Sequence, residues 1–284
     1  MPEWLNEILH PELGQHIRID RVLLRKTTDL QELLIFENAI LGRVLVLDGV
    51  IQTTEADEFI YHEMLSHVPI LAHGCAQRVL VLGGGDGGMI EEVLKHDSVE
   101  KVVMVEGDRS AVNLCQEYLP TLSRGAFDDP RLELVIADGS QYVTTSDQRF
   151  DIVIVDSPDP LGPGANLFSQ EFYYNCSLCL RPGGVLVTQN GVPFVQAEEL
   201  RNSAARLSHH FADVAFYRAS VPTYYGGDMA FGWASNTITL RTISIGQLQS
   251  RFAQANLDTR YYSPEIHIAA FATPPWFDRA LKSK

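Results

Sequence analysis

The sequence predicts an α/β protein with a doubly wound, mostly parallel sheet and a small N-terminal antiparallel β domain. From about residue 78 onward, apolar runs rich in Val and Ile alternate with helical patterns, which is typical of parallel strands buried on both faces. A glycine-rich turn follows the first of these runs, as in nucleotide-binding α/β folds. Before residue 60, shorter β-prone segments surround an Asp-Gly pair, which is a strong hairpin signal.

The composition is that of a soluble globular protein, and its excess of acids is compatible with a cationic ligand. Of the 284 residues, 45% are hydrophobic and 20% are charged, and 36 acids against 22 bases give a net charge of −14. Such a surface repels nucleic acid and anionic membranes and attracts cations. The chain has no signal-like N-terminus and no apolar run long enough to span a bilayer, so we expect a cytoplasmic protein without nucleic-acid or membrane partners.

Four cysteines provide no dense disulfide framework, in keeping with a reducing compartment. Cys176-x-x-Cys179 is a single pair without a second one, so we interpret it as helix packing and expect no metal site.

Residues 1–60 are predicted to form the N-terminal β-strand domain. Its expected strands cover residues 16–20, 32–36, 43–47 and 50–54. The last two flank Asp48-Gly49, so they are expected to pair as a hairpin.

Residues 61–284 are predicted to form a Rossmann-like catalytic domain. Its expected elements are strands at 78–82, 101–105, 132–136, 150–155 and 185–188, with helices at 89–96 and 111–118. In such a sheet the carboxyl ends of the strands meet at one edge, where ligands bind.

Acidic residues follow three successive predicted strands. Asp86 lies in the turn 83–88 (GGGDGG), Glu106 directly follows the second strand, and Asp138-Gly139 follows the third. An acid in the place of Glu106 accepts hydrogen bonds from ribose hydroxyls in related folds. Asp138 can accept from an adenine amine, and Gly139 leaves room for the ring. The pattern predicts an adenosyl pocket of the type found in S-adenosylmethionine methyltransferases.

The carboxylate of Asp86 predicts the charge of the ligand's tail. A pyrophosphate favours a helix N-terminus free of acids, so an acid in the glycine turn disfavours a dinucleotide. A sulfonium ligand with a free amine fits this turn better than NAD does.

The fourth predicted strand ends in a proline-rich loop, residues 156–164 (DSPDPLGPG). Its two acids, Asp156 and Asp159, stand three residues apart. Proline restricts the backbone, so these acids are expected to be held in place. That arrangement suits a general base aimed at an amine.

Taken together, these motifs resemble the spermidine synthase family of polyamine aminopropyltransferases. The resemblance runs from about residue 14 to about residue 271 and is carried by the blocks at 57–64 (DEFIYHEM), 83–87, 105–108, 138–139, 156–163 and 222–227 (PTYYGG). It implies transfer of the aminopropyl group of decarboxylated S-adenosylmethionine to putrescine or a similar amine, with methylthioadenosine released. The donor is a co-substrate, no other cofactor is implied, and a homodimer or homotetramer is expected.

The resemblance also implies roles for individual residues. The donor, or methylthioadenosine, would contact Gln31, Asp86, Glu106, Asp138, Gly139 and Pro163. The polyamine would contact His62, Asp86, Asp159, Gln189 and Tyr224. Asp156 would accept the proton, with Asp159 and Tyr61 as further catalytic residues. At least one of Glu55, Asp57 and Glu58 is expected to face the substrate.

Two positions depart from the family pattern and leave the choice of amine open. Gly107 stands where an aliphatic residue is usual, and Pro158 where Ser or Thr is usual. We therefore leave the preferred amine open and hypothesise a shift from putrescine towards a longer or differently headed amine.

The alternative functions are an S-adenosylmethionine-dependent methyl- or aminocarboxypropyl-transferase and a catalytically weak polyamine- or nucleoside-binding paralogue. Asp86 argues against the first because it would repel a carboxylate, and Asp156 argues against the second.

Overall fold

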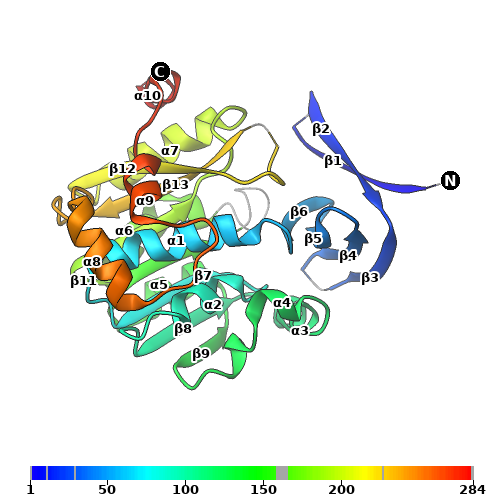
Figure 1. Ribbon diagram of the computed structural model, residues 1–284, viewed down its shortest axis with the longest axis horizontal. Coiled ribbons are helices and arrows are strands. Elements are labelled where there is room, and N and C mark those ends of the chain that lie inside the picture. The colour runs from blue at the N-terminus through cyan, green and yellow to red at the C-terminus, as the bar shows by residue number, and fades with distance from the viewer. Residues whose placement is uncertain (1, 11, 29, 158–165, 226, 283–284) are drawn as a thin grey trace.

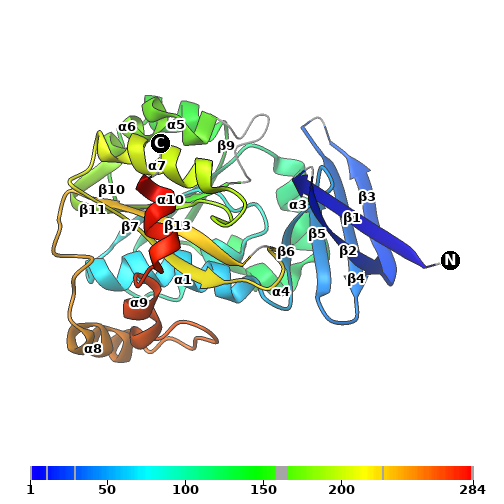
Figure 2. The same ribbon diagram turned by 90° about the horizontal axis from the view of Figure 1, so that it is seen from above.

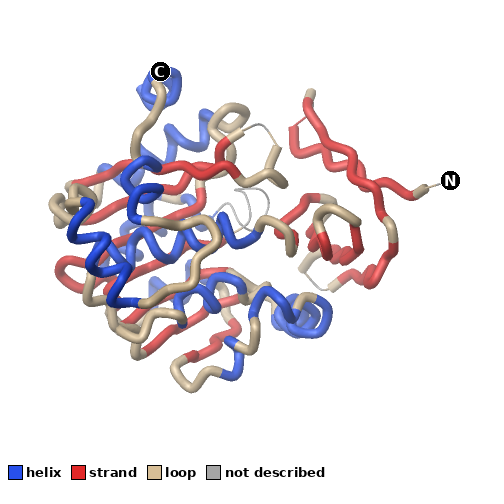
Figure 3. The backbone as a smooth tube through the Cα atoms, in the orientation of Figure 1, coloured by secondary structure: helices blue, strands red, loops and turns tan. Residues whose placement is uncertain are grey.

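The computed structural model describes residues 2–282 except residues 11, 29, 158–165 and 226. A large α/β part and a smaller N-terminal part lie side by side (Figure 1). In the described chain the N-terminal part consists of strands without helices (Figure 3). The predicted fold class is confirmed. None of the helices in the described ranges is long and apolar enough to cross a bilayer.

The strands of the N-terminal part are β1 (Glu3–His10), β2 (Leu13–Ile19), β3 (Arg21–Thr27), β4 (Glu32–Asn38), β5 (Gly42–Leu47) and β6 (Val50–Thr54). Those of the central sheet are β7 (Arg78–Gly83), β8 (Lys101–Glu106), β9 (Leu132–Ile136), β10 (Phe150–Asp156), β11 (Leu180–Gln189), β12 (Asp213–Ser220) and β13 (Asp228–Ser235).

The helices are α1 (Glu58–His73), α2 (Gly88–Leu94), α3 (Arg109–Tyr118), α4 (Pro120–Ser123), α5 (Gly139–Thr145), α6 (Gln170–Cys179), α7 (Ala197–Ser208), α8 (Ile245–Ala255), α9 (Pro264–Ala270) and α10 (Pro275–Lys282), with a short 3₁₀ turn at Ala126–Asp128.

The central sheet has seven strands in the order β12-β13-β11-β10-β7-β8-β9. The five strands from β11 to β9 are parallel, and β13 and β12 extend the sheet antiparallel. The chain moves outward from β7 to β9 and then returns to place β10 on the other side of β7. This reversal is a topological switch point, where open α/β sheets bind ligands beyond the carboxyl ends of their strands.

Helices cover both faces of this sheet, which explains why its inner strands β7, β8 and β10 consist mainly of buried apolar residues. The α1 side also carries α8 and α9, and α5, α6 and α7 lie on the opposite side (Figure 2). Residues 79–82 of β7 are all fully buried. A parallel strand packed on both faces has no solvent side on which polar residues would be stable.

The N-terminal part contains a four-stranded antiparallel sheet, β3-β4-β5-β6, and a separate hairpin, β1-β2. The predicted hairpin at Asp48-Gly49 is present, with Leu47 paired to Val50 and both turn residues at positive φ. Strands β1 and β3 were not predicted. In β1 an acid, Glu7, occupies a buried position while Ile8 is exposed, so the alternation of apolar and polar residues is lost.

Candidate active site

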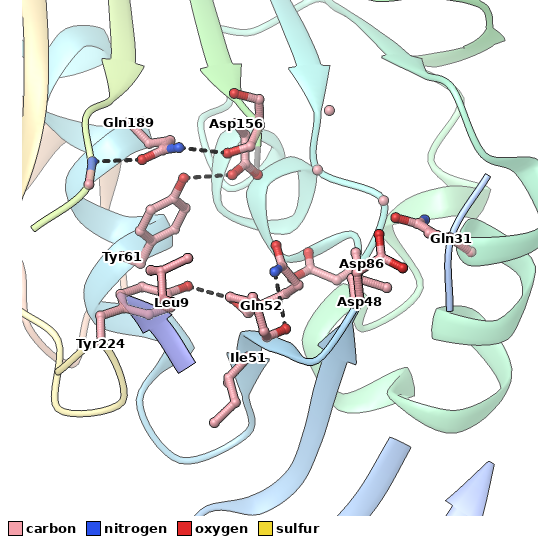
Figure 4. A pocket seen from close by; sticks show the side chains of 18 of the residues that line it. Leu9, Gln31, Asp48, Ile51, Gln52, Tyr61, Asp86, Asp156, Gln189 and Tyr224 are labelled. Atoms are coloured by element: carbon pink, nitrogen blue, oxygen red, sulfur yellow. Dashed lines mark hydrogen bonds between the residues drawn. The ribbon is translucent and has the colours of Figure 1, made fainter. Parts of the chain in front are cut away.

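A cavity of about 450 Å³ lies at the carboxyl edge of the central sheet, between it and the N-terminal part. Residues from both parts line it, and Tyr61 and Gln189 point toward Asp156 from different elements (Figure 4). The predicted site residues that line this cavity are Gln31, Tyr61, His62, Asp86, Glu106, Asp156, Gln189 and Tyr224. The topology therefore brings together side chains spread over almost 200 positions of sequence.

Asp156 ends β10 at the switch point, opposite Gly83 of β7. The two strands approach so closely that a Cβ on Gly83 would lie 1.9 Å from the Asp156 carbonyl oxygen. Gly83 also has φ +91°, which a side chain would strain. The amide of Gly84 donates a hydrogen bond of 3.0 Å to the same carbonyl. The glycines thus fix the backbone of Asp156 against the first strand.

The side chain of Asp156 is partly buried and has a raised pKa. The hydroxyl of Tyr61 donates to its Oδ1 at 2.7 Å. Burial raises the pKa of Asp156 to about 6, and Asp86 adds to this increase, whereas the charge of His62 and the Tyr61 hydrogen bond act against it. A carboxylate that takes up protons near pH 6 is still ionised at neutral pH, and it is a stronger base than an ordinary Asp.

This pKa predicts the acid side of the pH profile. A general base at Asp156, the role that the family resemblance implies, must be ionised to act. We therefore expect kcat/KM to fall about tenfold per pH unit below about pH 6 and not to depend on the ionisation of Asp156 above it. Because kcat/KM reports on the free enzyme, its profile should be measured at low concentrations of the amine. A fall that begins only near pH 4, the ordinary value for Asp, would contradict the burial of the ionising group.

Glu106, the last residue of β8, lines the cavity beside the glycine turn. Burial raises its pKa, and the amides of Asp108 and Gly107 oppose this. Gln31 lies close by, where its side-chain amide donates to Oδ2 of Asp108 at 3.1 Å. Asp108 was not predicted as a site residue, although it stands two positions after Glu106 in the same motif. It caps α3 through Ser110 and holds Gln31 in place.

Four predicted residues lie elsewhere or outside the described chain. Asp138 is exposed, and its side chain caps α5 by accepting from the amide of Gln141 at 2.7 Å. Neither Asp138 nor Gly139 is among the described residues that line the cavity. Asp159 and Pro163 fall outside the described residues, as does Pro158. Their assignments stay predictions.

Two further lining residues, Gln189 and Tyr224, are held by hydrogen bonds to the backbone. The amide nitrogen of Gln189 donates to the carbonyl of Ser157 at 2.9 Å, and its oxygen accepts from Gly191 at 2.8 Å. The hydroxyl of Tyr224 donates to the carbonyl of Gln52. Gln189 therefore ties β11 to the start of the loop that follows Asp156.

Several lining residues were not found from the sequence. They are contributed by β1, by the β5-β6 hairpin and by the segment after β11, and include Glu7, Leu9, Asp48, Gln52, Val192 and Gln196. The carboxylate of Glu7 accepts from the amide of Ile51 at 2.9 Å. No local pattern marks these residues, because their place depends on how the N-terminal part packs over the sheet edge.

The acidic run before and within the start of α1 does not meet the cavity: none of Glu55, Asp57 and Glu58 is among its lining residues. The expectation that one of them faces the substrate is therefore wrong for this cavity. Glu55 accepts from the amide of Arg43, and Glu58 bonds to His62. Asp57 is buried and accepts from both the amide and the hydroxyl of Thr223 at 2.7 and 2.6 Å.

Asp57 anchors the tip of the β12-β13 hairpin, which carries Tyr224. Asp57→Ala leaves two buried donors of Thr223 without their partner, at a cost of about 1–3 kcal/mol. A decrease in Tm of several degrees is expected, since each kcal/mol shifts Tm by about 2–4 °C at this size. We also expect KM for the amine to rise more than kcat falls. Thermal unfolding and steady-state kinetics check this, with Asp147→Ala at an exposed acid as control. An unchanged Tm would contradict the anchoring role.

Comparisons with known proteins show the family to which the chain belongs. The spermine/spermidine synthase domain family matches residues 58–243, and the spermidine synthase tetramerisation domain family matches residues 3–55. Polyamine aminopropyltransferase 1 of Pseudomonas aeruginosa is 57% identical over 275 residues, covering 97% of this chain and 96% of the relative. The polyamine aminopropyltransferase of Shigella flexneri is 52% identical over 282 residues, covering 99% and 98%.

Solved structures give the same result. A spermidine synthase crystallised with the transition-state analogue AdoDATO superposes with a TM-score of 0.93 at 38% identity, covering 99% of this chain and 97% of the other. Spermidine synthase from Thermotoga maritima superposes with a TM-score of 0.90 at 37% identity, covering 99% and 96%. The chain therefore belongs to the spermine/spermidine synthase family and is a transferase of the polyamine aminopropyltransferase type.

Proposed function

We propose that this enzyme transfers the aminopropyl group of decarboxylated S-adenosylmethionine to putrescine or a similar amine, with Asp156 as the proton acceptor. The observation that carries the proposal is the partly buried Asp156 carboxylate, bonded to Tyr61 at 2.7 Å, at the switch point of the sheet. The relatives named polyamine aminopropyltransferase support the same reaction.

The chemistry requires a base at this position. A primary alkylamine has a pKa of about 10.4, so at neutral pH it is protonated and cannot attack. Asp156 takes the proton as the amine nitrogen forms a bond to the methylene carbon next to the sulfonium. The bond between that carbon and sulfur breaks, and neutral methylthioadenosine leaves. Positive charge moves from sulfur to nitrogen, and the acids of the cavity stabilise it along this path.

We assign the adenosyl part of the donor to Gln31 and Glu106, whose carboxylate at the end of β8 can accept from the ribose hydroxyls. Asp86 is assigned to the amine of the aminopropyl tail. The contacts described for its carboxylate, to the amide of Gly88 and to His62, both involve Oδ1. The roles of Asp138, Gly139 and Pro163 rest on the family resemblance.

We assign the acceptor to the side of the cavity formed by His62, Gln189 and Tyr224. Since Gln189 bonds Ser157 and Gly191 through both ends of its amide, its role is to shape this wall. Two further roles are proposed from the sequence alone. Asp159 is proposed to bind the amine, and Pro158 is proposed to influence which amine is preferred.

A product test separates this function from its alternatives. The enzyme is incubated with decarboxylated or intact S-adenosylmethionine and a panel of putrescine, cadaverine, agmatine and spermidine, and products are identified by mass spectrometry. Methylthioadenosine and an aminopropylated amine from the decarboxylated donor support the proposal. A methylated or aminocarboxypropylated product from the intact donor would replace it, and binding without turnover would indicate a sensing paralogue.

We further propose that residues 1–60 serve assembly and residues 61–284 catalysis, in a cytoplasmic homodimer or homotetramer. The tetramerisation domain family covers residues 3–55, and Trp4, Ile8 and Leu13 expose apolar side chains on the β1-β2 hairpin. Light scattering after size-exclusion chromatography gives the oligomer size, and a monomer at micromolar concentration would contradict the proposal.

A further inference from the structure

The imidazole of His62 lies between two carboxylates. Its Nδ1 is 2.7 Å from Oε2 of Glu58, and its Nε2 is 3.8 Å from Oδ1 of Asp86. The residue is only 2% exposed. A neutral imidazole carries one N–H, so its other nitrogen would present a lone pair to a carboxylate. Only the doubly protonated ring presents a proton to both acids.

The ring is also held in one position by packing. A Cβ on Gly88 would lie 2.3 Å from Cε1 of His62, so the ring lies directly on the glycine turn. Tyr61 contacts it edge-on, with ring centroids 5.3 Å apart. Glu58 precedes His62 by one helical turn on α1 and bonds it from that side. The imidazole is therefore a fixed part of the site.

The catalytic base lies at the other end of the same turn. A Cβ on Gly84 would lie 3.0 Å from Oδ2 of Asp156, just as one on Gly88 would meet His62. Tyr61 contacts both groups, through its ring to His62 and through its hydroxyl to Asp156. The ring is thus placed to act on the carboxylate electrostatically.

The charges agree with this geometry. Burial alone would lower the pKa of His62, but Asp86 and Glu58, with a contribution from Asp156, raise it to about 10. Burial raises the pKa of Asp156, and His62 is the strongest influence that lowers it. Among the described residues, the titratable groups that face His62 are these three acids and Tyr61.

We propose that His62 is a positioning residue for proton transfer: Glu58 and Asp86 hold it as a fixed imidazolium, and this cation keeps the Asp156 carboxylate in the anionic form that accepts the proton. The inference rests on the proposed function, because it gives His62 a role in the action of Asp156. It goes beyond a place in the acceptor wall, which an uncharged side chain of similar size could fill equally well.

The pH profile of a His62 variant tests the proposal. His62→Gln keeps a polar side chain of similar reach and removes the charge, so the acid limb of kcat/KM is expected to move up by roughly one pH unit or more. At about pH 8 the variant should regain most of its activity. A limb that stays in place while only KM for the amine rises would assign His62 to the pocket wall and overturn the proposal.

In Glu58→Gln the acid limb of the kcat/KM profile is not expected to move up as it does in His62→Gln. Asp86 still faces His62 in this variant, so the ring should remain charged near pH 6. Because a negative charge has been removed, the acid limb should stay or move down. Glu55→Gln, in the same acidic run but with bonds to Arg43 and Thr121, is the matched control and should leave the limb in place. An upward shift in Glu58→Gln equal to that of His62→Gln would indicate a general loss of structure and contradict the charge assignment.

A second measurement needs no substrate, so it separates this inference from the proposed function. The His62 resonance, identified by its absence from spectra of His62→Gln, is followed by NMR between about pH 5 and pH 9. It is expected not to titrate in the wild-type protein and to titrate at lower pH in Glu58→Gln. Titration near the ordinary value of about 6.5 in the wild type would overturn the proposal. The proposed function fails separately if the wild-type enzyme yields no aminopropylated amine.

Discussion

Asp156→Asn is expected to lower kcat by roughly 10²–10⁴, the usual contribution of a positioned general base. The amide matches the carboxylate in shape, so the cavity and its donor contacts should persist, but it cannot accept the proton of the attacking amine. Asp156 also accepts a hydrogen bond from the hydroxyl of Tyr61. The amide oxygen of Asn can accept this bond equally well. The loss should therefore lie in kcat, with Kd for the donor changed little.

Raising the pH should partly rescue this variant, because more of the amine is then neutral without help. The measurement is kcat from about pH 7 to about pH 10 for both proteins, with the donor Kd determined by calorimetry. Asp147→Asn, at an exposed acid outside the cavity, is the control. Near-normal turnover of Asp156→Asn at neutral pH would remove Asp156 from the mechanism.

Decarboxylated S-adenosylmethionine is expected to bind at least roughly 100-fold more tightly than S-adenosylmethionine. Asp86 is fixed in the glycine turn by the amide of Gly88 at 2.9 Å and lies in the cavity wall. The intact donor would bring its own carboxylate to this acid, and a like-charge contact in such a site costs several kcal/mol. Each 1.4 kcal/mol corresponds to about tenfold in Kd.

Calorimetric titration of both compounds measures this ratio. Asp86→Asn should reduce it to within about tenfold, mainly by weakening binding of the decarboxylated donor. Glu106→Gln is the matched comparison, since we assign Glu106 to the ribose that both donors share. It should weaken both donors alike. Equal affinities of the wild-type protein for the two donors would rule out the role of Asp86.

The five parallel strands of the central sheet could be predicted from sequence because each contains a short apolar run, whereas the antiparallel strands β12 and β13 were not predicted. Residues 79–82 and 150–155 were placed correctly for this reason. The ends of these strands were equally clear, since glycine and acid clusters interrupt the apolar runs there. That is why Asp86, Glu106 and Asp156 were all identified and all line the cavity.

Side-chain partners were much less predictable. The contact of Gln189 with the polyamine stays a prediction, but the sequence did not show that its amide is bonded to Ser157 and Gly191. Asp57 had been grouped with residues that face the substrate, but it binds Thr223 from far along the chain. An acid in a charged segment can contact a ligand or another part of the chain. Which of the two occurs depends on long-range packing, and the local sequence pattern does not predict it.

The sequence by itself determined the fold class, the strand ends that bear acids and, through its motifs, the family. These depend on interactions within short segments, where burial and turn chemistry act locally. Only the tertiary structure decided that Glu7 and Gln52 of the N-terminal part complete the cavity. It alone also set His62 between Glu58 and Asp86 beside the base. The pKa of a buried group depends on which charges surround it in space, and the chain brings those charges together only when it folds.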